Sequence, residues 1–329
     1  MDEVRVLITG GTGFIGRHLT RLLLDKGWEV YVLSRKDRFT EDYPFKDEVN
    51  LATADLLDPE KVREVVKNVL PEVVIHMAAL TAVRKSFKEP NLFMRVNYGG
   101  TVNLVEALRD YQPSLFLFYS TAETYFSSDT PHTEDEPIGG ETPYAISKAA
   151  AELYVRYAVK AGYLNKVVIV RPCNVYDRSI MRDIEESRGY FVEKAIIGML
   201  ENKKYLAFGN PTSTRTWMHV EDHVSAINAI LEHGGERGII TTNISGEEHY
   251  ECWHIVTMLK SITNYKGSIL WYNSECMRPY DPPCLTLAEG RFLREIGWKP
   301  RLNILDGLKK AVENWRRVLS EEGEKASSR

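Results

Sequence analysis

A tyrosine and a lysine four residues apart, Tyr144 and Lys148, stand out chemically within the stretch PYAISKAAAE. If that stretch is helical, the two side chains lie one turn apart on the same face. A tyrosine with its ordinary pKa of about 10 is a poor base at neutral pH, whereas a neighbouring ammonium group favours the phenolate. The pair therefore predicts removal of a proton from an alcohol, although amphipathic helices also produce this spacing by chance.

A glycine-rich stretch, ITGGTGFIG, follows an apolar run at residues 4–8 and precedes a helical pattern, so it lies at a strand-to-helix turn. Its spaced glycines are Gly10, Gly13 and Gly16. The first permits a tight turn, the second lets the backbone approach a phosphate, and the third packs helix against strand. Backbone amides at the helix start, at Phe14 and Ile15, can then hold the pyrophosphate of a dinucleotide. Glycine clusters also mark ordinary turns, so this spacing alone is a weak signal.

A third group of polar side chains, Ser120, Thr121 and Glu123, follows the apolar run at residues 115–119. In an open parallel sheet, ligands bind at the carboxyl ends of the strands. We therefore expect these side chains near a bound cofactor, with Thr121 able to hydrogen-bond a substrate hydroxyl. The alternative is that the hydroxyl groups only cap the turn, which leaves Glu123 unexplained.

Composition and charge argue against nucleic acid or a membrane as partner, and against disulfides or a metal site. The sequence carries 42 Lys and Arg against 46 Asp and Glu, a net charge of −4, and no basic block, so we expect neither nucleic acid nor a membrane as partner. No apolar run could span a bilayer and the N-terminus lacks the order of a signal peptide, which predicts a cytoplasmic protein. The four cysteines have no C-x-x-C spacing, so we expect neither disulfides nor a metal site.

Short apolar runs alternate with helical patterns along the first half of the chain. The runs lie at residues 4–8, 29–33, 73–76, 115–119 and 167–170. Runs without polar alternation suit strands that are covered on both faces. The order predicts an α/β fold, a Rossmann-type doubly wound parallel sheet.

Beyond residue 172 the pattern changes, which predicts a smaller C-terminal α/β lobe for the substrate. Its helical patterns lie near residues 189–203, 222–233, 251–263 and 302–319. We expect a dinucleotide-binding domain at residues 1–172, a mainly substrate-binding lobe at 173–319 and a flexible tail at 320–329.

The end of the second predicted strand bears on the choice of dinucleotide. A carboxylate there accepts from the ribose 2′-hydroxyl of NAD(H) and repels the extra phosphate of NADP(H). This strand ends without an acid and is followed by Arg35 and Lys36. The sequence therefore favours NADP(H), with NAD(H) possible, although the two cations could also form a solvated loop. After the third strand, Asp55 and Leu56 are placed to receive the adenine, or Asp55 is simply a cap.

Taken together, these residues resemble the extended short-chain dehydrogenases/reductases of the nucleotide-sugar epimerase and dehydratase group, nearly end to end. Besides the glycine turn and the Tyr144/Lys148 pair, the shared motifs are Asp55-Leu56, His76-Met-Ala-Ala79, Val96-Asn97 with Gly100-Thr101, Ser120-Thr121, Arg171-Pro172-x-Asn174, Arg215, and Arg278-Pro279 with Gly297-Trp298-x-Pro300. The resemblance implies a nucleoside-diphosphate sugar as substrate and adds Ala78 and Asn97 to the cofactor contacts. The residues that it places against the substrate are Arg84, Asn174, Arg215 and Arg278.

The resemblance also implies a shared first step and a second step that decides the product. The Tyr144 phenolate takes the proton of the sugar 4-hydroxyl while hydride leaves C4 for the nicotinamide, which gives a 4-keto sugar. A 4,6-dehydratase then needs a carboxylate that removes the C5 proton, and Glu123 occupies that position in a triplet with Thr121. A 4-epimerase needs no further base, and Ala122 resembles the epimerases.

We therefore predict an enzyme, a nucleotide-sugar 4,6-dehydratase, with a 4-epimerase as the alternative. A 4-keto-sugar reductase, a decarboxylase and a non-catalytic NADP sensor on the same fold are less expected, since a sensor needs no activated phenol. By resemblance, the amphipathic patterns at residues 91–110 and 145–161 imply a four-helix interface in a homodimer or homotetramer.

Overall fold

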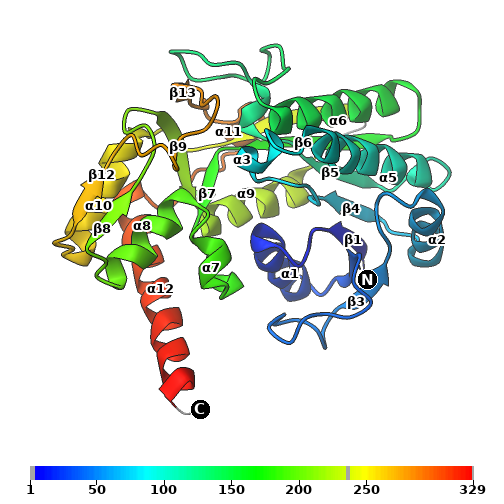
Figure 1. Cartoon of the computed structure of the whole chain (residues 1–329). Coiled ribbons are helices and arrows are strands. Elements are labelled where there is room, and N and C mark those ends of the chain that lie inside the picture. The colour runs from blue at the N-terminus through cyan, green and yellow to red at the C-terminus, as the bar shows by residue number, and fades with distance from the viewer. Residues whose placement is uncertain (1–3, 235–237, 328–329) are drawn as a thin grey trace.

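A seven-stranded parallel sheet forms the centre of the computed structural model, which describes residues 4–234 and 238–327 (Figure 1). Its strand order is β10-β6-β5-β4-β1-β2-β3. The strands are β1 (Arg5–Thr9), β2 (Glu29–Ser34), β3 (Asn50–Thr53), β4 (Val73–His76), β5 (Leu115–Tyr119), β6 (Lys166–Pro172) and β10 (Gly238–Ile244). The predicted Rossmann-type sheet is thereby confirmed, and the five apolar runs are β1, β2, β4, β5 and β6.

Helices cover both faces of this sheet because its strands carry apolar side chains on both sides. Along β1, Val6 and Ile8 enter one core and Leu7 enters the other. The helices over the first core are α1 (Phe14–Asp25), α9 (Val220–His233) and α11 (Arg291–Glu295). Those over the second core are α2 (Pro59–Val69), α5 (Gly100–Leu108) and α6 (Pro143–Lys160).

The strand register aligns the residues that carry the predicted chemistry. Thr9 pairs with His76, and His76 pairs with Phe118, so β1, β4 and β5 end at one edge of the sheet. The glycine turn after β1 and the polar segment after β5 therefore open on the same edge. Short helices lie in the segments that follow the strands: α3 (Val83–Ser86), α4 (Pro90–Phe93) and the π-helix η1 (Met94–Gly99) after β4, the 3-10 helix η2 (Ala122–Thr124) after β5, and the 3-10 helix η3 (Arg178–Met181) after β7.

The smaller lobe has a core of its own around the buried Trp315, and it lies at the left of Figure 1. Its helices are α7 (Ile184–Ser187), α8 (Phe191–Leu200), α10 (Cys252–Thr263) and α12 (Ile304–Ser327). One of its small sheets contains β7 (Asn174–Tyr176), β9 (Thr214–His219), β11 (His249–Glu251) and β13 (Cys284–Leu285), and the other β8 (Tyr205–Ala207) and β12 (Ser268–Leu270). None of the helices in the described ranges is long and apolar enough to cross a membrane.

The chain crosses between the two lobes more often than the expected boundary at residue 172 suggests. Strand β10 pairs with β6 in the large sheet, and α9 covers one face of that sheet. The expected tail also differs, since α12 continues to Ser327, while residues 328–329 lie outside the described part. An ion pair of 2.6 Å between Arg182 and Glu321 attaches this last part of the helix to the lobe.

Candidate active site

The glycine turn after β1 has the shape that a dinucleotide needs. Gly10 has a φ of +77°, and a Cβ there would lie 2.9 Å from the backbone nitrogen of Ala78. A Cβ at Gly16 would overlap the carbonyl oxygen of Gly10, so the helix packs directly on the turn. Helix α1 starts at Phe14, and within the described ranges the amides of Phe14 and Ile15 have no hydrogen-bond acceptor. These free donors fit the phosphates of a dinucleotide.

The residues expected at the adenosine end of the cofactor are placed as follows. Arg35 is exposed just after β2 and makes no ion pair or hydrogen bond with any other described residue. Asp55 accepts a hydrogen bond of 2.9 Å from the backbone nitrogen of Leu57, so it caps the turn, as the alternative interpretation held. Leu56 is buried and packs against Gly100.

Tyr144 and Lys148 lie on the first two turns of α6, which begins at Pro143 and is capped by Thr142. Both side chains are buried. Burial raises the pKa of Tyr144, although hydrogen bonding to Thr121 opposes this, and burial lowers the pKa of Lys148 to about 7. The structure thus differs from the expectation that an ammonium group lowers the tyrosine pKa, because desolvation favours the neutral form of both groups.

Thr121 and Glu123 lie in the short turn after β5 and face the same site. The Thr121 hydroxyl accepts from the backbone nitrogen of Glu123 at 3.3 Å, so it caps η2, and hydrogen bonding to Thr121 acts to lower the pKa of Tyr144. The Glu123 side chain is 16% exposed, and its negative charge contributes to the raised pKa of Tyr144. The contact of its carboxylate is with Arg278, whose Nη1 lies 3.5 Å from Glu123 Oε1.

The four residues expected to contact the substrate converge on two neighbouring segments. Arg215 and Arg278 both contact Asp281 Oδ1, at 3.0 and 3.2 Å. Arg84 donates to the carbonyl oxygen of Met277 at 3.3 Å, and Asn174 Nδ2 donates to the Thr216 carbonyl at 3.3 Å. The structure thus brings together arginines that are far apart in sequence.

Asn97, an expected cofactor contact, positions the loop after β4 and helix α6. Its side-chain oxygen accepts from the backbone nitrogen of Leu80 at 2.7 Å. Its side-chain nitrogen donates to the Leu80 carbonyl at 3.0 Å and to the Ser147 hydroxyl at 2.9 Å. These bonds hold α6, which carries Tyr144 and Lys148, against that loop.

Sequence reasoning missed a buried ionic network beneath the site. Glu152, one turn beyond Lys148, accepts 2.6 Å and 3.2 Å hydrogen bonds from Ser120 and from Nε of Arg171. Burial alone would raise the pKa of Glu152, but hydrogen bonding and the charge of Arg171 hold it below its usual value. Arg171 also donates to the Tyr125 hydroxyl at 2.7 Å. The spacing of Lys148 and Glu152 on one helical face was a signal that could have revealed the network.

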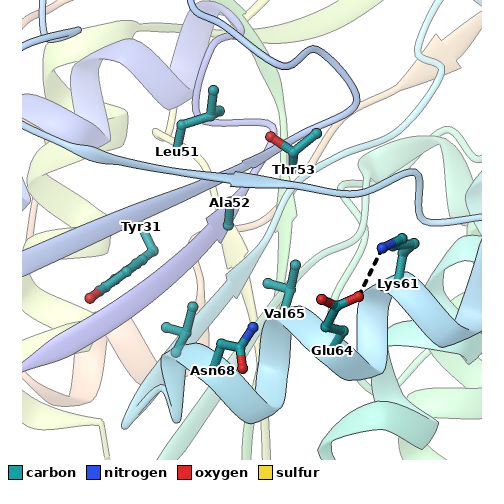
Figure 2. A pocket seen from close by; sticks show the side chains of 9 residues that line it. Tyr31, Leu51, Ala52, Thr53, Lys61, Glu64, Val65 and Asn68 are labelled. Carbon is teal, nitrogen blue, oxygen red and sulfur yellow. Dashed lines mark hydrogen bonds and ion pairs between the residues drawn. The ribbon is translucent and has the colours of Figure 1, made fainter.

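A pocket outside this site lies between strand β3 and helix α2, next to the ion pair of 2.9 Å between Lys61 and Glu64 (Figure 2). Its walls are formed by Tyr31, Leu51, Ala52, Thr53, Lys61, Glu64, Val65, Asn68 and Val69. None of the predicted site residues lines it. Within the described ranges no three His, Cys, Asp or Glu side chains are placed to hold a metal ion.

The doubly wound sheet, the glycine turn and the Tyr144/Lys148 pair define a short-chain dehydrogenase/reductase. Residues 6–244 match the NAD dependent epimerase/dehydratase family, and the chain belongs to that family. It is 27% identical to a dTDP-glucose 4,6-dehydratase of Salmonella typhimurium (94% of this chain, 92% of the relative) and 29% identical to a UDP-glucose 4-epimerase of Bacillus subtilis (94% and 96%).

Solved structures give the same family and bear on the cofactor. The UDP-glucose 4-epimerase of Thermotoga maritima, solved with UDP-glucose, has a TM-score of 0.84 at 26% identity (95% of this chain, 99% of that one). The UDP-glucose 4-epimerase of Thermus thermophilus, solved with NAD, has a TM-score of 0.81 at 26% identity (95% and 99%). These comparisons confirm the predicted enzyme family, whereas the preference for NADP(H) over NAD(H) gains no support from them.

Proposed function

We propose that this chain is a nucleotide-sugar 4,6-dehydratase. Its relatives include both dehydratases and epimerases, so membership of the family leaves the reaction open. The observation that carries the proposal is the position of Glu123, which lies in the turn capped by Thr121 and has a mostly buried carboxylate 3.5 Å from Arg278. A 4-epimerase has no step that needs such a second base, whereas a dehydratase does.

Each residue then has a role in the reaction. Tyr144 takes the proton of the sugar 4-hydroxyl as the phenolate. Burial alone favours the neutral phenol, and the positive charge of a bound oxidised nicotinamide would favour the phenolate instead. A bound nicotinamide dinucleotide supplies the hydride acceptor for C4 and the hydride that later returns to C6. Glu123 removes the C5 proton, which the 4-ketone has made acidic, and the 6-hydroxyl leaves. Since Ala122 carries no proton donor, Glu123 delivers that same proton to the departing hydroxyl, so one water molecule is lost. When hydride is added at C6, the Tyr144 phenol gives the proton that it took from the 4-hydroxyl to C5, which completes the product.

The substrate would be held through its diphosphate by the convergent arginines. Arg215 and Arg278 present guanidinium groups, whose planar geometry matches phosphate oxygens. Arg84 and Asn174 lie on segments adjacent to them and would complete the contacts. This arrangement agrees with the UDP-glucose present in the Thermotoga maritima structure.

A 4-epimerase is the second candidate. Ala122 supports it, because this position holds no acid that could assist the departure of a hydroxyl group. The similarity to the Thermotoga maritima UDP-glucose 4-epimerase, with a TM-score of 0.84, also supports it. The two reactions differ in the mass of the product, which makes them separable.

The test is to incubate the enzyme with nucleotide hexoses in deuterated water and to analyse products by mass spectrometry. A dehydratase gives a product that has lost one water molecule and carries deuterium at C5, whereas a product of unchanged mass indicates the epimerase. Glu123→Gln should stop the elimination but still allow reduction of the bound cofactor. The matched control is Glu275→Gln at an exposed glutamate. Full dehydratase activity of Glu123→Gln would show that another group is the base.

For the cofactor, we infer that NAD(H) binds and that Arg35 sets how well NADP(H) competes. The family supports NAD(H), while the unpaired Arg35 after β2 offers a charge to a 2′-phosphate. Arg35→Ala should lower the affinity for NADP(H) and leave that for NAD(H) unchanged. Lys67→Ala, at an exposed residue of α2 that is not expected to contact the cofactor, is the control. An unchanged ratio of the two affinities in Arg35→Ala would exclude this role.

A homodimer is also part of the proposal. Helix α6 exposes three large apolar side chains: Ile146 (49% exposed), Leu153 (54%) and Tyr157 (50%). Tyr98, in the neighbouring η1, is also exposed and its ring contacts that of Tyr154 on α6. Apolar side chains on one helix face are typical of a helix-to-helix interface between subunits.

A further inference from the structure

Four charged side chains, Glu123, Arg215, Arg278 and Asp281, form one connected series of ion pairs. Arg278 Nη1 lies 3.5 Å from Glu123 Oε1 and 3.2 Å from Asp281 Oδ1. Arg215 Nη2 lies 3.0 Å from the same oxygen of Asp281. Two guanidinium groups thus face two carboxylates, and the formal charge of the cluster is zero. Such a cluster offers no unpaired cation to an incoming anion.

The two carboxylates in this cluster are held very differently. Asp281 contacts both arginines, and its second oxygen accepts from the Ser213 hydroxyl at 3.2 Å. The Glu123 carboxylate contacts Arg278 alone among the described residues, and at the longest distance in the cluster. Arg278 is also the more exposed arginine, at 32% against 6% for Arg215. The contact between Arg278 and Glu123 is therefore the weakest link.

We propose that Arg278 holds Glu123 until the diphosphate of the substrate displaces it, so that the base is released only when a nucleotide is bound. A diphosphate brings at least two negative charges, and a guanidinium group binds phosphate oxygens in a bidentate manner better than a single distant carboxylate oxygen. Arg278 is thus a positioning residue that acts through Glu123. This inference rests on the proposed function, since it assigns Glu123 the role of base.

A consequence can be measured without turnover: Glu123 competes with the diphosphate for Arg278. Glu123→Gln removes the competitor, so it should tighten binding of a nucleoside diphosphate, whereas loss of a merely structural contact would weaken binding or leave it unchanged. For a partly exposed ion pair we expect the Kd to fall about two- to five-fold.

The experiment titrates the full chain, saturated with NAD, with UDP, dTDP, GDP and CDP by calorimetry, and then follows the nucleotide that binds best. Removing the negative charge of Glu123 would also tighten binding simply by lessening its repulsion of the diphosphate. Glu275→Gln, in the segment that leads to Arg278, controls for net charge and should leave the Kd unchanged. Glu123→Gln is therefore also made in an Arg278→Gln background, with weak binding measured by ligand-observed NMR. The tightening should be larger when Arg278 is present.

Three results would overturn the proposal: no binding of any of the four nucleotides, an unchanged or weaker Kd in Glu123→Gln, or equal tightening with and without Arg278. The outcome is separable from that of the proposed function, because these nucleotides carry no hexose and so cannot undergo the proposed reaction. An epimerase product with tighter binding in Glu123→Gln would refute the dehydratase and retain the competition for Arg278. A dehydratase product without tighter binding in Glu123→Gln would support the dehydratase and refute the competition for Arg278.

Discussion

The buried network beneath the active site allows a sharp test, because one carboxylate contacts two arginines of different burial. Glu152 is fully buried and pairs with Arg171, whose side chain is 2% exposed, and with Arg156, which is 30% exposed and 2.8 Å away. Arg171→Met leaves a buried carboxylate without its main partner and should cost about 3–5 kcal/mol of the free energy of unfolding. Arg156→Met removes a partly hydrated pair and should cost about 0.2–1 kcal/mol.

The measurement is urea unfolding of the full chain followed by circular dichroism, with both variants and the wild type at one pH. Because both substitutions replace arginine by methionine on the same carboxylate, burial is the main variable. Glu152→Leu combined with Arg171→Met should cost less than the sum of the two single variants, since each alone strands a charge. Equal losses for Arg156→Met and Arg171→Met, or a strictly additive double variant, would refute the reasoning.

Three further predictions concern pH, the glycine turn and assembly. Burial lowers the pKa of Lys148 to about 7. Between pH 7 and the lysine pKa of about 10.4 in the unfolded chain, the unfolded state binds one more proton than the folded state. The free energy of unfolding should therefore rise with pH over this range, and more in the wild type than in Lys148→Met. Urea unfolding at two pH values would measure this. Gly16→Ala should weaken NAD binding more than ten-fold in fluorescence titrations because its Cβ would overlap the turn, whereas Gly99→Ala, with open space around it, should leave binding intact; normal binding by Gly16→Ala would contradict this. Leu153→Glu should convert the proposed dimer to monomer in sedimentation experiments, and an unchanged mass would place the interface elsewhere.

The sheet was predictable because its information is local. Each apolar run that became β1, β2, β4, β5 or β6 is continuous in the sequence, and burial on both faces removes the need for alternation. The return of β10 to the sheet was not predictable, since its segment, residues 238–244, lies among elements of the smaller lobe. The position of β10 beside β6 depends on pairing between segments that are far apart in the sequence, and composition does not report such pairing.

The site divides in the same way. The motifs placed Tyr144 and Lys148 correctly on one helix, but the pKa of each depends on how deeply the fold buries it, and no spacing reports that. Likewise, Arg278 was expected to contact the substrate. Its ion pair with Glu123 could not be predicted, because the two segments are adjacent only in the folded chain. Residue types thus predicted which groups take part, and the fold decided which groups they face.

The site has one rigid half and one adjustable half, and this division fits a family with several products. Helix α6 is fixed by Asn97 at Ser147 and by Glu152 at Ser120, through buried hydrogen bonds of 2.9 and 2.6 Å on either side of Lys148. The phenol and amine that we propose for the shared oxidation are therefore preorganised. Glu123, by contrast, is held through a single, partly exposed contact. Since only the steps after oxidation differ between dehydratases and epimerases, changes around this adjustable carboxylate could alter the product while the anchored pair on α6 stays as it is.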